Sequence, residues 1–234
     1  MKKAFILAII LNLCPLLRYQ VLAETVTCPT IADVYIDELS PDENFNYKTR
    51  ILISYHPSKG RARGLLKFNI PMDLEASQIE TATLYLSGSY HTSGGVSIDV
   101  NCYALNEPFS EGSDTWNTLS GGDYDTSVTS PGTLPAGNDW ETSFDVTALV
   151  TGNLQKLSNN GMLMRLQSEG PLNEHQHIAS REFTDPQDFA AYLEISFVEA
   201  QPVPTLTEWG MIILVILLLV IGTIAIVRNR RAIT

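Results

Sequence analysis

Residues 96–103 read Val-Ser-Ile-Asp-Val-Asn-Cys-Tyr and alternate apolar with polar side chains. Successive side chains of a β-strand point to opposite faces, so this period of two predicts a strand. Its apolar face holds Val96, Ile98, Val100 and Cys102. One apolar and one polar face together favour an antiparallel sheet that packs on one side only.

The same period recurs along the chain, and turns rich in Gly, Pro, Asn and Ser separate the repeats. The further predicted strands are residues 32–36, 50–55, 64–70, 82–86, 142–146, 162–166 and 190–198. One short helix is predicted at residues 147–157, with Asp145 as its cap. Eight or nine strands in one domain predict an all-β fold, an antiparallel and jelly-roll-like β-sandwich.

The N-terminus carries an export signal. Lys2 and Lys3 precede an apolar run within residues 1–23, which is the pattern of a secretory signal peptide cut near Ala23. Residues 24–199 then form the predicted ectodomain. All 26 acidic residues but only nine of the 15 basic ones lie within residues 24–208, which therefore carry a formal charge of −17. Such a surface repels nucleic acid, so no nucleic-acid partner is expected.

The C-terminus is strongly apolar and ends in basic residues. Residues 210–227 hold no charge, and a helix of this length would be about 27 Å long. This is enough to cross a bilayer, so we predict a transmembrane helix at 210–227 that attaches the chain to the membrane. Residues 228–234 would be a cytoplasmic basic tail. Residues 200–209 are the predicted linker and sorting motif.

The sequence before this helix resembles a known family signal. Residues 203–210 read Val-Pro-Thr-Leu-Thr-Glu-Trp-Gly, similar to the bacterial IPTL-CTERM protein-sorting signal. The positions that carry the resemblance are Val203, Pro204, Thr205, Leu206, Glu208, Trp209 and Gly210. The resemblance implies an exosortase-type enzyme that cuts near the motif. The protein would pass through the inner membrane and reach the cell surface or extracellular matrix; a plain C-terminal anchor is the alternative.

A second resemblance covers most of the ectodomain. Its short motifs recur in one order at residues 32–36, 63–70, 79–86, 111–117, 144–150 and 180–182. The series resembles the DNRLRE domain, a β-sandwich of bacterial and archaeal surface proteins related to carbohydrate-binding modules. It implies a structural, adhesive or carbohydrate-binding role in the envelope or matrix, with polysaccharide as a partner. Residues 108–111 lack the tryptophan often present before Glu111, which removes any sugar site built on that ring.

No catalytic constellation stands out in the chain. It has no Gly-x-Ser-x-Gly elbow, no His-Glu-x-x-His and no Gly-rich phosphate loop. We therefore predict that the protein is not an enzyme. The alternative is a polysaccharide-degrading enzyme, a glycoside hydrolase or lyase with a β-sandwich catalytic domain, which would need two carboxylates facing each other across a cleft.

Cys28 and Cys102 are the cysteines of the ectodomain. An oxidising exterior permits a disulfide between them, and closing a loop of about 75 residues would stabilise by roughly 4 kcal/mol. We predict this pairing. The alternative is a pair of buried free thiols.

Structural calcium is the one cofactor that the sequence suggests. Asp33 and Asp37 belong to an acidic region near the N-terminus, and hard carboxylate ligands on irregular backbone suit calcium. Plain surface charge is the alternative. His175 and His177, two apart beside Glu174, are the best candidates for a transition metal, but no third ligand is evident.

Arg61, Arg63 and Lys67 form the one basic cluster of the ectodomain. We expect it to make cross-strand charge pairs with Arg181 and Glu182 rather than to bind an anionic sugar. Aromatic rings are the usual platforms for sugars. The candidates are Tyr55, Tyr85, Tyr90, Tyr103, Trp116, Tyr124 and Trp140, of which Trp116 and Trp140 are expected to close the ends of the core. The sequence names no ligand.

Overall fold

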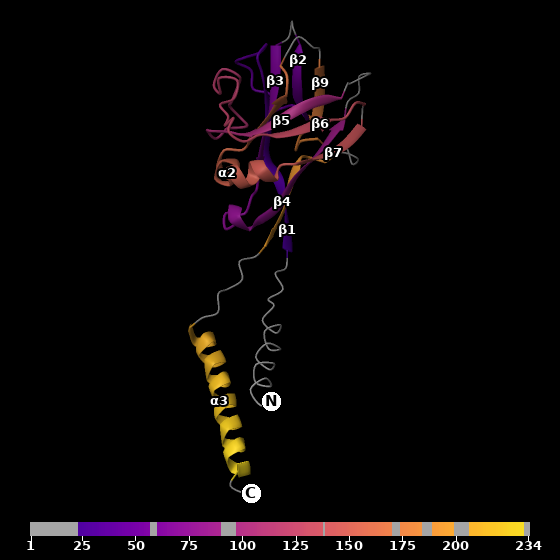
Figure 1. Ribbon diagram of the computed structural model, residues 1–234. Helices are drawn as coiled ribbons and strands as arrows, with labels where there is room; N and C mark the ends of the chain where they lie inside the picture. The colour runs from indigo at the N-terminus through magenta and orange to yellow at the C-terminus, as the bar shows by residue number, and fades with distance from the viewer. Residues whose placement is uncertain are drawn as a thin grey trace. The chain divides into compact units, whose positions relative to one another are not determined.

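The computed structural model describes residues 23–56, 60–89, 97–137, 139–169, 174–183, 189–198 and 206–231. The chain divides into two compact units, Met1–Glu199 and Ala200–Thr234. The ten strands of the first unit are β1 (Ala23–Asp37), β2 (Arg50–His56), β3 (Gly60–Phe68), β4 (Ile79–Ser89), β5 (Ile98–Ala104), β6 (Ser130–Leu134), β7 (Asp139–Asp145), β8 (Met162–Leu166), β9 (Glu174–Ala179) and β10 (Tyr192–Val198) (Figure 1).

Three helices complete the described chain. They are η2 (Ala76–Gln78), α2 (Thr147–Asn159) and α3 (Leu206–Arg231). The predicted helix at 147–157 is confirmed by α2, but the residue at its N-cap is Val146 and not the predicted Asp145, which accepts a hydrogen bond from the Thr147 N–H at 2.9 Å. Leu149, Val150 and Leu157 bury one face of α2 against the strands.

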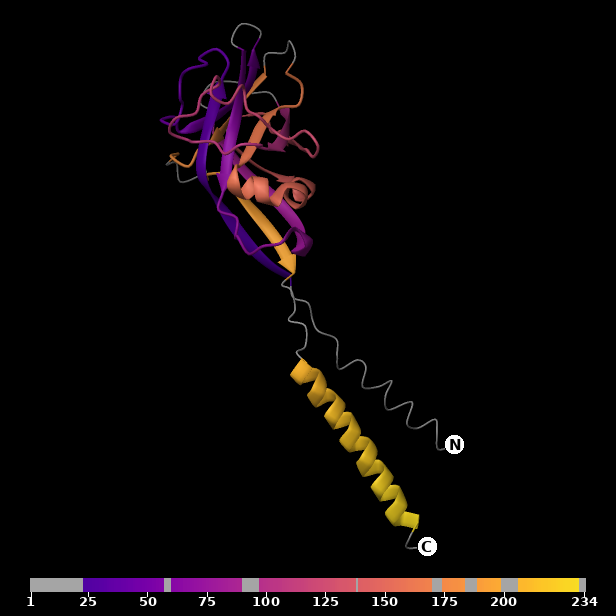
Figure 2. The ribbon, with the colours of Figure 1, turned by 90° about the vertical axis from the view of Figure 1, so that its left-hand side faces the viewer.

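Every strand pairing is antiparallel, which confirms the predicted all-β antiparallel class. The main path through the sheet runs β6-β5-β8-β3-β1-β10-β4-β7, and β2 and β9 branch from β3. The strands curl into a nearly closed, barrel-like sandwich instead of two separate layers (Figure 2). This strand order does not establish the predicted jelly roll.

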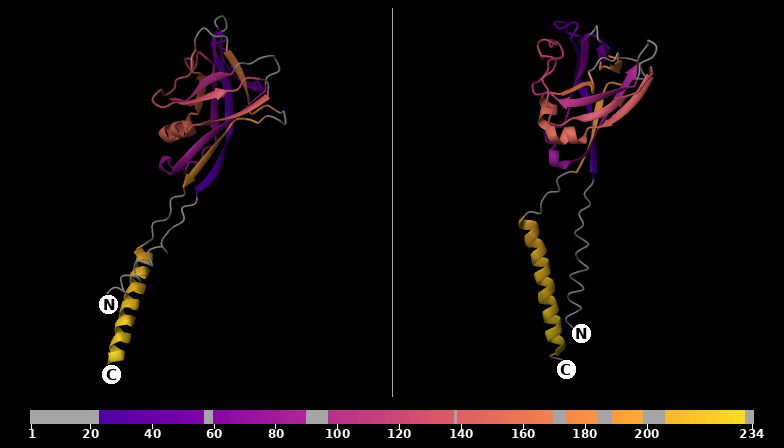
Figure 3. Two further views of the ribbon diagram at one scale, coloured as in Figure 1. Left: turned by 45° about the vertical axis from the view of Figure 1, so that its right-hand side comes forward. Right: turned by 45° about the horizontal axis from the view of Figure 1, so that its top comes forward.

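The long strand β1 joins the two halves of this sheet. Its first part, Ala23 to Pro29, pairs with β10, and its second part, Thr30 to Asp37, pairs with β3. The register shifts between Thr30 and Ala32, directly after Pro29. Proline lacks an N–H and is tolerated at such irregularities. Figure 3 shows β10, in orange, beside β1, in indigo.

The predicted alternation places the core correctly. Ile98, Val100 and Cys102 of β5 are buried, as predicted. So are Ala82, Leu84 and Leu86 of β4 and Ala191, Leu193 and Ile195 before and within β10. In β3, however, Leu65 and Leu66 are both buried, at 0% and 1% exposure, so both faces of this strand are covered. The core covers one face, and the segment between β5 and β6 covers the other.

The predicted disulfide between Cys28 and Cys102 is wrong for this structure, since both are free, buried thiols. Cys28 lies in β1 opposite Leu193 of β10, whereas Cys102 lies in β5 between Ser130 of β6 and Met164 of β8. The two strands are not neighbours, and each thiol packs in the apolar core. Burial raises the pKa of Cys28 to about 11 and that of Cys102 to about 12.

The predicted transmembrane helix is not supported. Among the described residues, no helix is long and apolar enough to cross a membrane. Helix α3 begins at Leu206, so residues 206–210 of the sorting motif are helical and do not extend the linker. Of the predicted signal peptide, residues 1–23, all but Ala23 lie outside the described part of the chain, as do residues 199–205 and 232–234.

Candidate functional site

Residues 105–129, which connect β5 to β6, form the cover over the outer face of β3 and β8; we call them the covering segment. A bridge between Leu105 and Tyr124 closes its base. Its Gly122 has a positive φ of 91°, and a Cβ there would lie 2.3 Å from the Leu163 Cδ1 atom. The close approach requires glycine, and it presses the segment onto the sheet.

Two arginines of the sheet lie against three aromatic rings, of which Trp116 and Tyr124 belong to this segment and Tyr103 belongs to β5. We call this set the arginine–aromatic ladder: Trp116, Arg63, Tyr124, Arg165 and Tyr103. The Arg63 guanidinium lies 5.0 Å from the Trp116 ring centroid and 5.8 Å from that of Tyr124. The Arg165 guanidinium lies 5.5 Å from Tyr124 and 5.6 Å from Tyr103. These distances fit cation–π attraction.

Glu169 binds both arginines of the ladder. Arg63 donates from Nε and Nη2 to its two carboxylate oxygens, at 2.8 and 2.7 Å, and Arg165 donates from Nη1 at 2.8 Å. Arg63 also donates to the Gly121 carbonyl. The sequence predicted Arg181 and Glu182 as the partners of the basic cluster. That prediction is wrong, because Glu169, on the turn after β8, reaches β3 instead.

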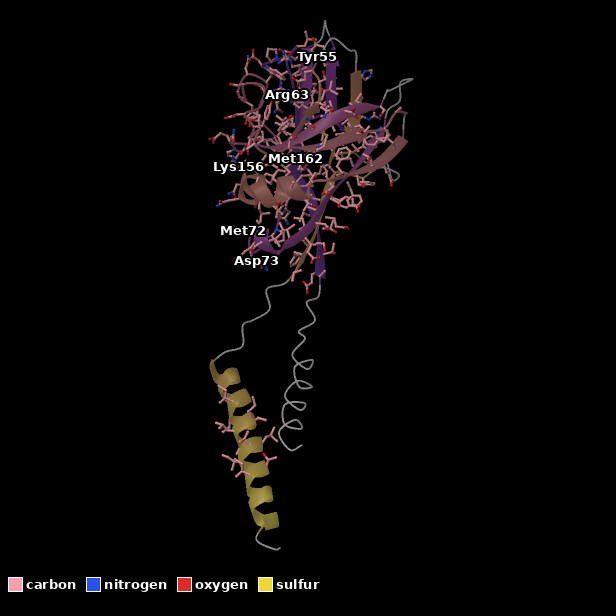
Figure 4. All side chains as sticks on the ribbon, in the orientation of Figure 1. Tyr55, Arg63, Met72, Asp73, Lys156 and Met162 are labelled. Atoms are coloured by element: carbon pink, nitrogen blue, oxygen red, sulfur yellow. The ribbon has the colours of Figure 1, made fainter. Side chains whose placement is uncertain are left out.

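The two arginines of the ladder, Arg63 and Arg165, differ in how deeply their side chains are buried. The Arg63 side chain is only 7% exposed and donates to the Gly121 carbonyl, which ties the covering segment to the sheet. Figure 4 labels Arg63 among the side chains of the sandwich. The Arg165 side chain is 21% exposed, and its Nε, itself out of contact with solvent, has no hydrogen-bond partner. Trp116 and Tyr124 are half-buried. Arg165, Trp116 and Tyr124 therefore combine hydrogen-bond donors with ring faces at the surface.

A second polar cluster anchors the start of the covering segment. Asp33 of β1 is buried, and its backbone N–H donates to Glu111 Oε1 at 2.9 Å. Arg181 donates from its own N–H to Asp33 Oδ2 at 2.8 Å and from Nη2 to Glu111 Oε2 at 2.7 Å. Glu182 lies 3.1 Å from the same Nη2. The predicted residues Arg181 and Glu182 thus meet Glu111, and Arg61 and Arg63 do not belong to this cluster.

The pKa of Asp33 is raised to about 7. Burial is the main cause, and the carboxylates of Glu182 and Glu111 also raise the pKa, whereas the hydrogen bond from the Arg181 N–H and the Arg181 charge lower it. One oxygen of each of the three carboxylates lies within 4.8 Å of the others. The predicted ligand Asp37 is not among them, and its carboxylate instead accepts the Leu39 N–H. Arg181 already supplies a positive charge here, and calcium remains a prediction.

The histidine pair lies on β9, with ring centroids 6.4 Å apart. Burial, then the charges of His175 and Arg50, lowers the pKa of His177 to about 4. In the described ranges, no group of three metal-ligating side chains includes either histidine.

The remaining aromatic candidates scatter over the molecule. Tyr85 stacks on Tyr192 at the outer face of β4 and β10, with centroids 4.7 Å apart. Trp140 is buried, as expected, and Tyr55 is half-buried on β2. Tyr90 lies outside the described residues. The sequence reasoning missed Arg165, Glu169 and Tyr192, because no local pattern marks them.

The fold and this surface define a β-sandwich-like module that offers aromatic rings and guanidinium groups at its surface. Comparison with family models then assigns it. Residues 24–196 match carbohydrate-binding module family 96, so the chain belongs to that family. The family comparison does not return the DNRLRE domain that the sequence resembles. Residues 201–231 match the IPTL-CTERM motif, which supports the predicted sorting signal. The search of curated proteins finds no match.

Proposed function

We propose that the chain is an exported bacterial surface protein whose sandwich binds polysaccharide through the exposed part of the arginine–aromatic ladder. The family match supports the ligand class. The observation that carries the location is Arg165, a partly exposed guanidinium over the neighbouring rings of Tyr103 and Tyr124. Arg165 lies within residues 24–208, which carry a strongly negative net charge, so its partly exposed guanidinium distinguishes this part of the surface.

The chemistry suits sugar recognition. The rings of Tyr124 and Trp116 offer flat apolar surface to the C–H face of a pyranose, and neighbouring polar groups fix its orientation. The Arg165 guanidinium offers planar donors to sugar hydroxyls or to a carboxylate on the glycan. Glu169 holds the two arginines in place, so the surface is preorganised before the ligand arrives.

The arrangement supports binding over hydrolysis. Glycoside hydrolysis needs two carboxylates facing each other across the scissile bond. Glu169 is engaged by Arg63 and Arg165, and the Asp33 cluster is tied to Arg181. We therefore propose a structural, adhesive or carbohydrate-binding role, with polysaccharide degradation as the alternative.

The C-terminal motif supports the proposal that the protein is sorted after export. The IPTL-CTERM match is the basis for proposing an exosortase-type enzyme as a partner, with the mature protein at the cell surface or in the extracellular matrix.

Glycan binding by residues 24–199 tests the ladder. This piece holds all ten strands and α2 and forms its own compact unit. A glycan array identifies the ligand, and calorimetry then compares variants. Tyr124→Ala and Arg165→Ala should each weaken binding about tenfold or more, which is about 1.4 kcal/mol. The control Tyr47→Ala removes a tyrosine that is 60% exposed outside the ladder and should bind like the parent.

Equal losses from Tyr47→Ala and Tyr124→Ala would contradict the assignment. Reducing-sugar release, measured in the same samples, should stay at background, and release by the parent that an unfolded control lacks would favour the enzyme.

A further inference from the structure

The outer face of strands β1, β10, β4 and β7 carries a second surface, distinct from the ladder. Their alternate residues Cys28, Leu193, Leu84 and Phe144 are buried, so the residues between them point outward. The register aligns them in rows across the sheet. One row is Pro29, Tyr192, Tyr85 and Ser143, and the next is Thr27, Glu194, Thr83 and Asp145.

Two tyrosines form the centre of this face, which we call the tyrosine face. The rings of Tyr85 and Tyr192 stack with 4.7 Å between centroids and 10° between planes. Phe189 leans on Tyr192 at 5.4 Å. Phe189 is held in place by Ser87, which is fully buried: its Oγ donates to the Phe189 carbonyl at 2.7 Å and accepts the Phe189 N–H at 2.9 Å. The sheet thus builds and positions a three-ring platform.

Three carboxylates surround Tyr85. Glu194 and Asp145 both pair in register with Thr83, two residues before Tyr85, and Glu141 pairs with Ser87, two residues after it. Each carboxylate is therefore a diagonal neighbour of Tyr85, at about 7–8 Å in a regular sheet. Glu141 and Asp145 are exposed and Glu194 is half-buried.

Among the residues that the structure describes, no cation pairs with these carboxylates. Strands β1, β10, β4 and β7 contain neither lysine nor arginine. Hydrogen bonds from the Thr147 hydroxyl and N–H lower the pKa of Asp145, so it is ionised at neutral pH. A ligand for this face must complement aromatic rings and fixed negative charge.

We propose that the tyrosine face binds a glycan of free amino sugars, whose ring C–H faces stack on Tyr85 and whose ammonium groups pair with the surrounding carboxylates. Charge complementarity selects this occupant. An anionic glycan would meet three uncompensated carboxylates, and a second copy of the chain would bring another strongly acidic surface. An ammonium group gains from both the carboxylates and the tyrosine rings. This inference rests on the proposed carbohydrate-binding function but uses a different surface.

The test uses the full mature chain and a glucosamine hexamer, with its fully N-acetylated counterpart as the uncharged match. The parent should bind the glucosamine hexamer at least tenfold more tightly than the acetylated one at pH 6. Tyr85→Ala and Glu194→Gln should each lower that affinity about tenfold. The control Glu80→Gln removes an exposed carboxylate at the start of β4, outside the diagonal set, and should bind like the parent.

Equal losses from Glu80→Gln and Glu194→Gln, with Tyr85→Ala unchanged, would mean attraction by overall charge only and would overturn the proposal. Concentration-dependent dimerisation that Tyr85→Ala abolishes, without hexamer binding, would also overturn it. Arg165→Ala separates the two surfaces. It should weaken the ligand of the ladder and leave hexamer binding intact, so failure of either surface is visible independently of the other.

Discussion

At the scale of single residues, Arg63 is constrained by several contacts at once. It is buried, forms a two-point bond with Glu169, donates to the Gly121 carbonyl and lies between the rings of Trp116 and Tyr124. Leaving a partner charge buried and unpaired is costly, so an arginine held this way is structural. The neighbouring Arg61, whose side chain is 41% exposed, lies 3.7 Å from Glu169 and 3.6 Å from Glu38, so its contact with the same carboxylate is the weaker one.

Replacing Arg63 tests this difference. Arg63→Ala should lower the free energy of unfolding by about 3–5 kcal/mol, because the buried Glu169 loses its two-point partner and keeps only Arg165 and the more exposed Arg61, and the Gly121 carbonyl loses its donor. Arg61→Ala is the matched control and should cost less than about 1 kcal/mol. Urea denaturation of residues 24–199 measures both. Similar small losses from the two substitutions would show that Arg63 does not hold the covering segment.

At the scale of elements, the period of two located the strands well wherever one face is buried. Residues 162–166 and 50–55 became β8 and β2 with almost the predicted bounds. Strand β6 was missed because Pro131 and Gly132 indicated a turn, whereas Gly132 is needed where the Phe144 ring approaches to 2.5 Å of its Cβ position. Strand β1 is longer than predicted, since its proline falls at the register shift.

The candidate site was predictable only in part, for a physical reason. Arg63, Trp116 and Tyr124 could each be named from the sequence. Their meeting with Arg165 and Glu169 depends on contacts between segments 41 to 106 residues apart, which no local period records. The sequence predicted that Arg63 pairs with charged residues of a neighbouring strand. In the structure its partner is Glu169, which lies after β8.

At the scale of the whole molecule, the two surfaces carry opposite local charge. The ladder concentrates arginines, and the tyrosine face concentrates carboxylates on strands free of lysine and arginine. Together with a match to a sorting motif, this suits a protein that works outside the cell among polysaccharides. The tail should then be processed after export.

The sorting proposal makes a specific prediction for residues 203–210. Replacing Pro204 and Trp209 together with Ala should leave export intact but block removal of the tail, because the enzyme reads the motif. The control Thr207→Ser restores the residue usual in the motif and should be processed like the parent. Intact mass of the surface protein measures the outcome. The same C-terminus in the parent and the double variant would contradict the proposal.

The most direct test of the central claim is the fluorescence of Trp116 during glycan titration. Residues 24–199 contain two tryptophans, Trp116 in the ladder and Trp140, which is 8% exposed at the start of β7. In the Trp140→Phe variant, emission from Trp116 should change on addition of the array-selected glycan and saturate at the calorimetric Kd. The Trp116→Phe variant should show no change. A saturable change from Trp140 with a silent Trp116 would contradict binding at the ladder.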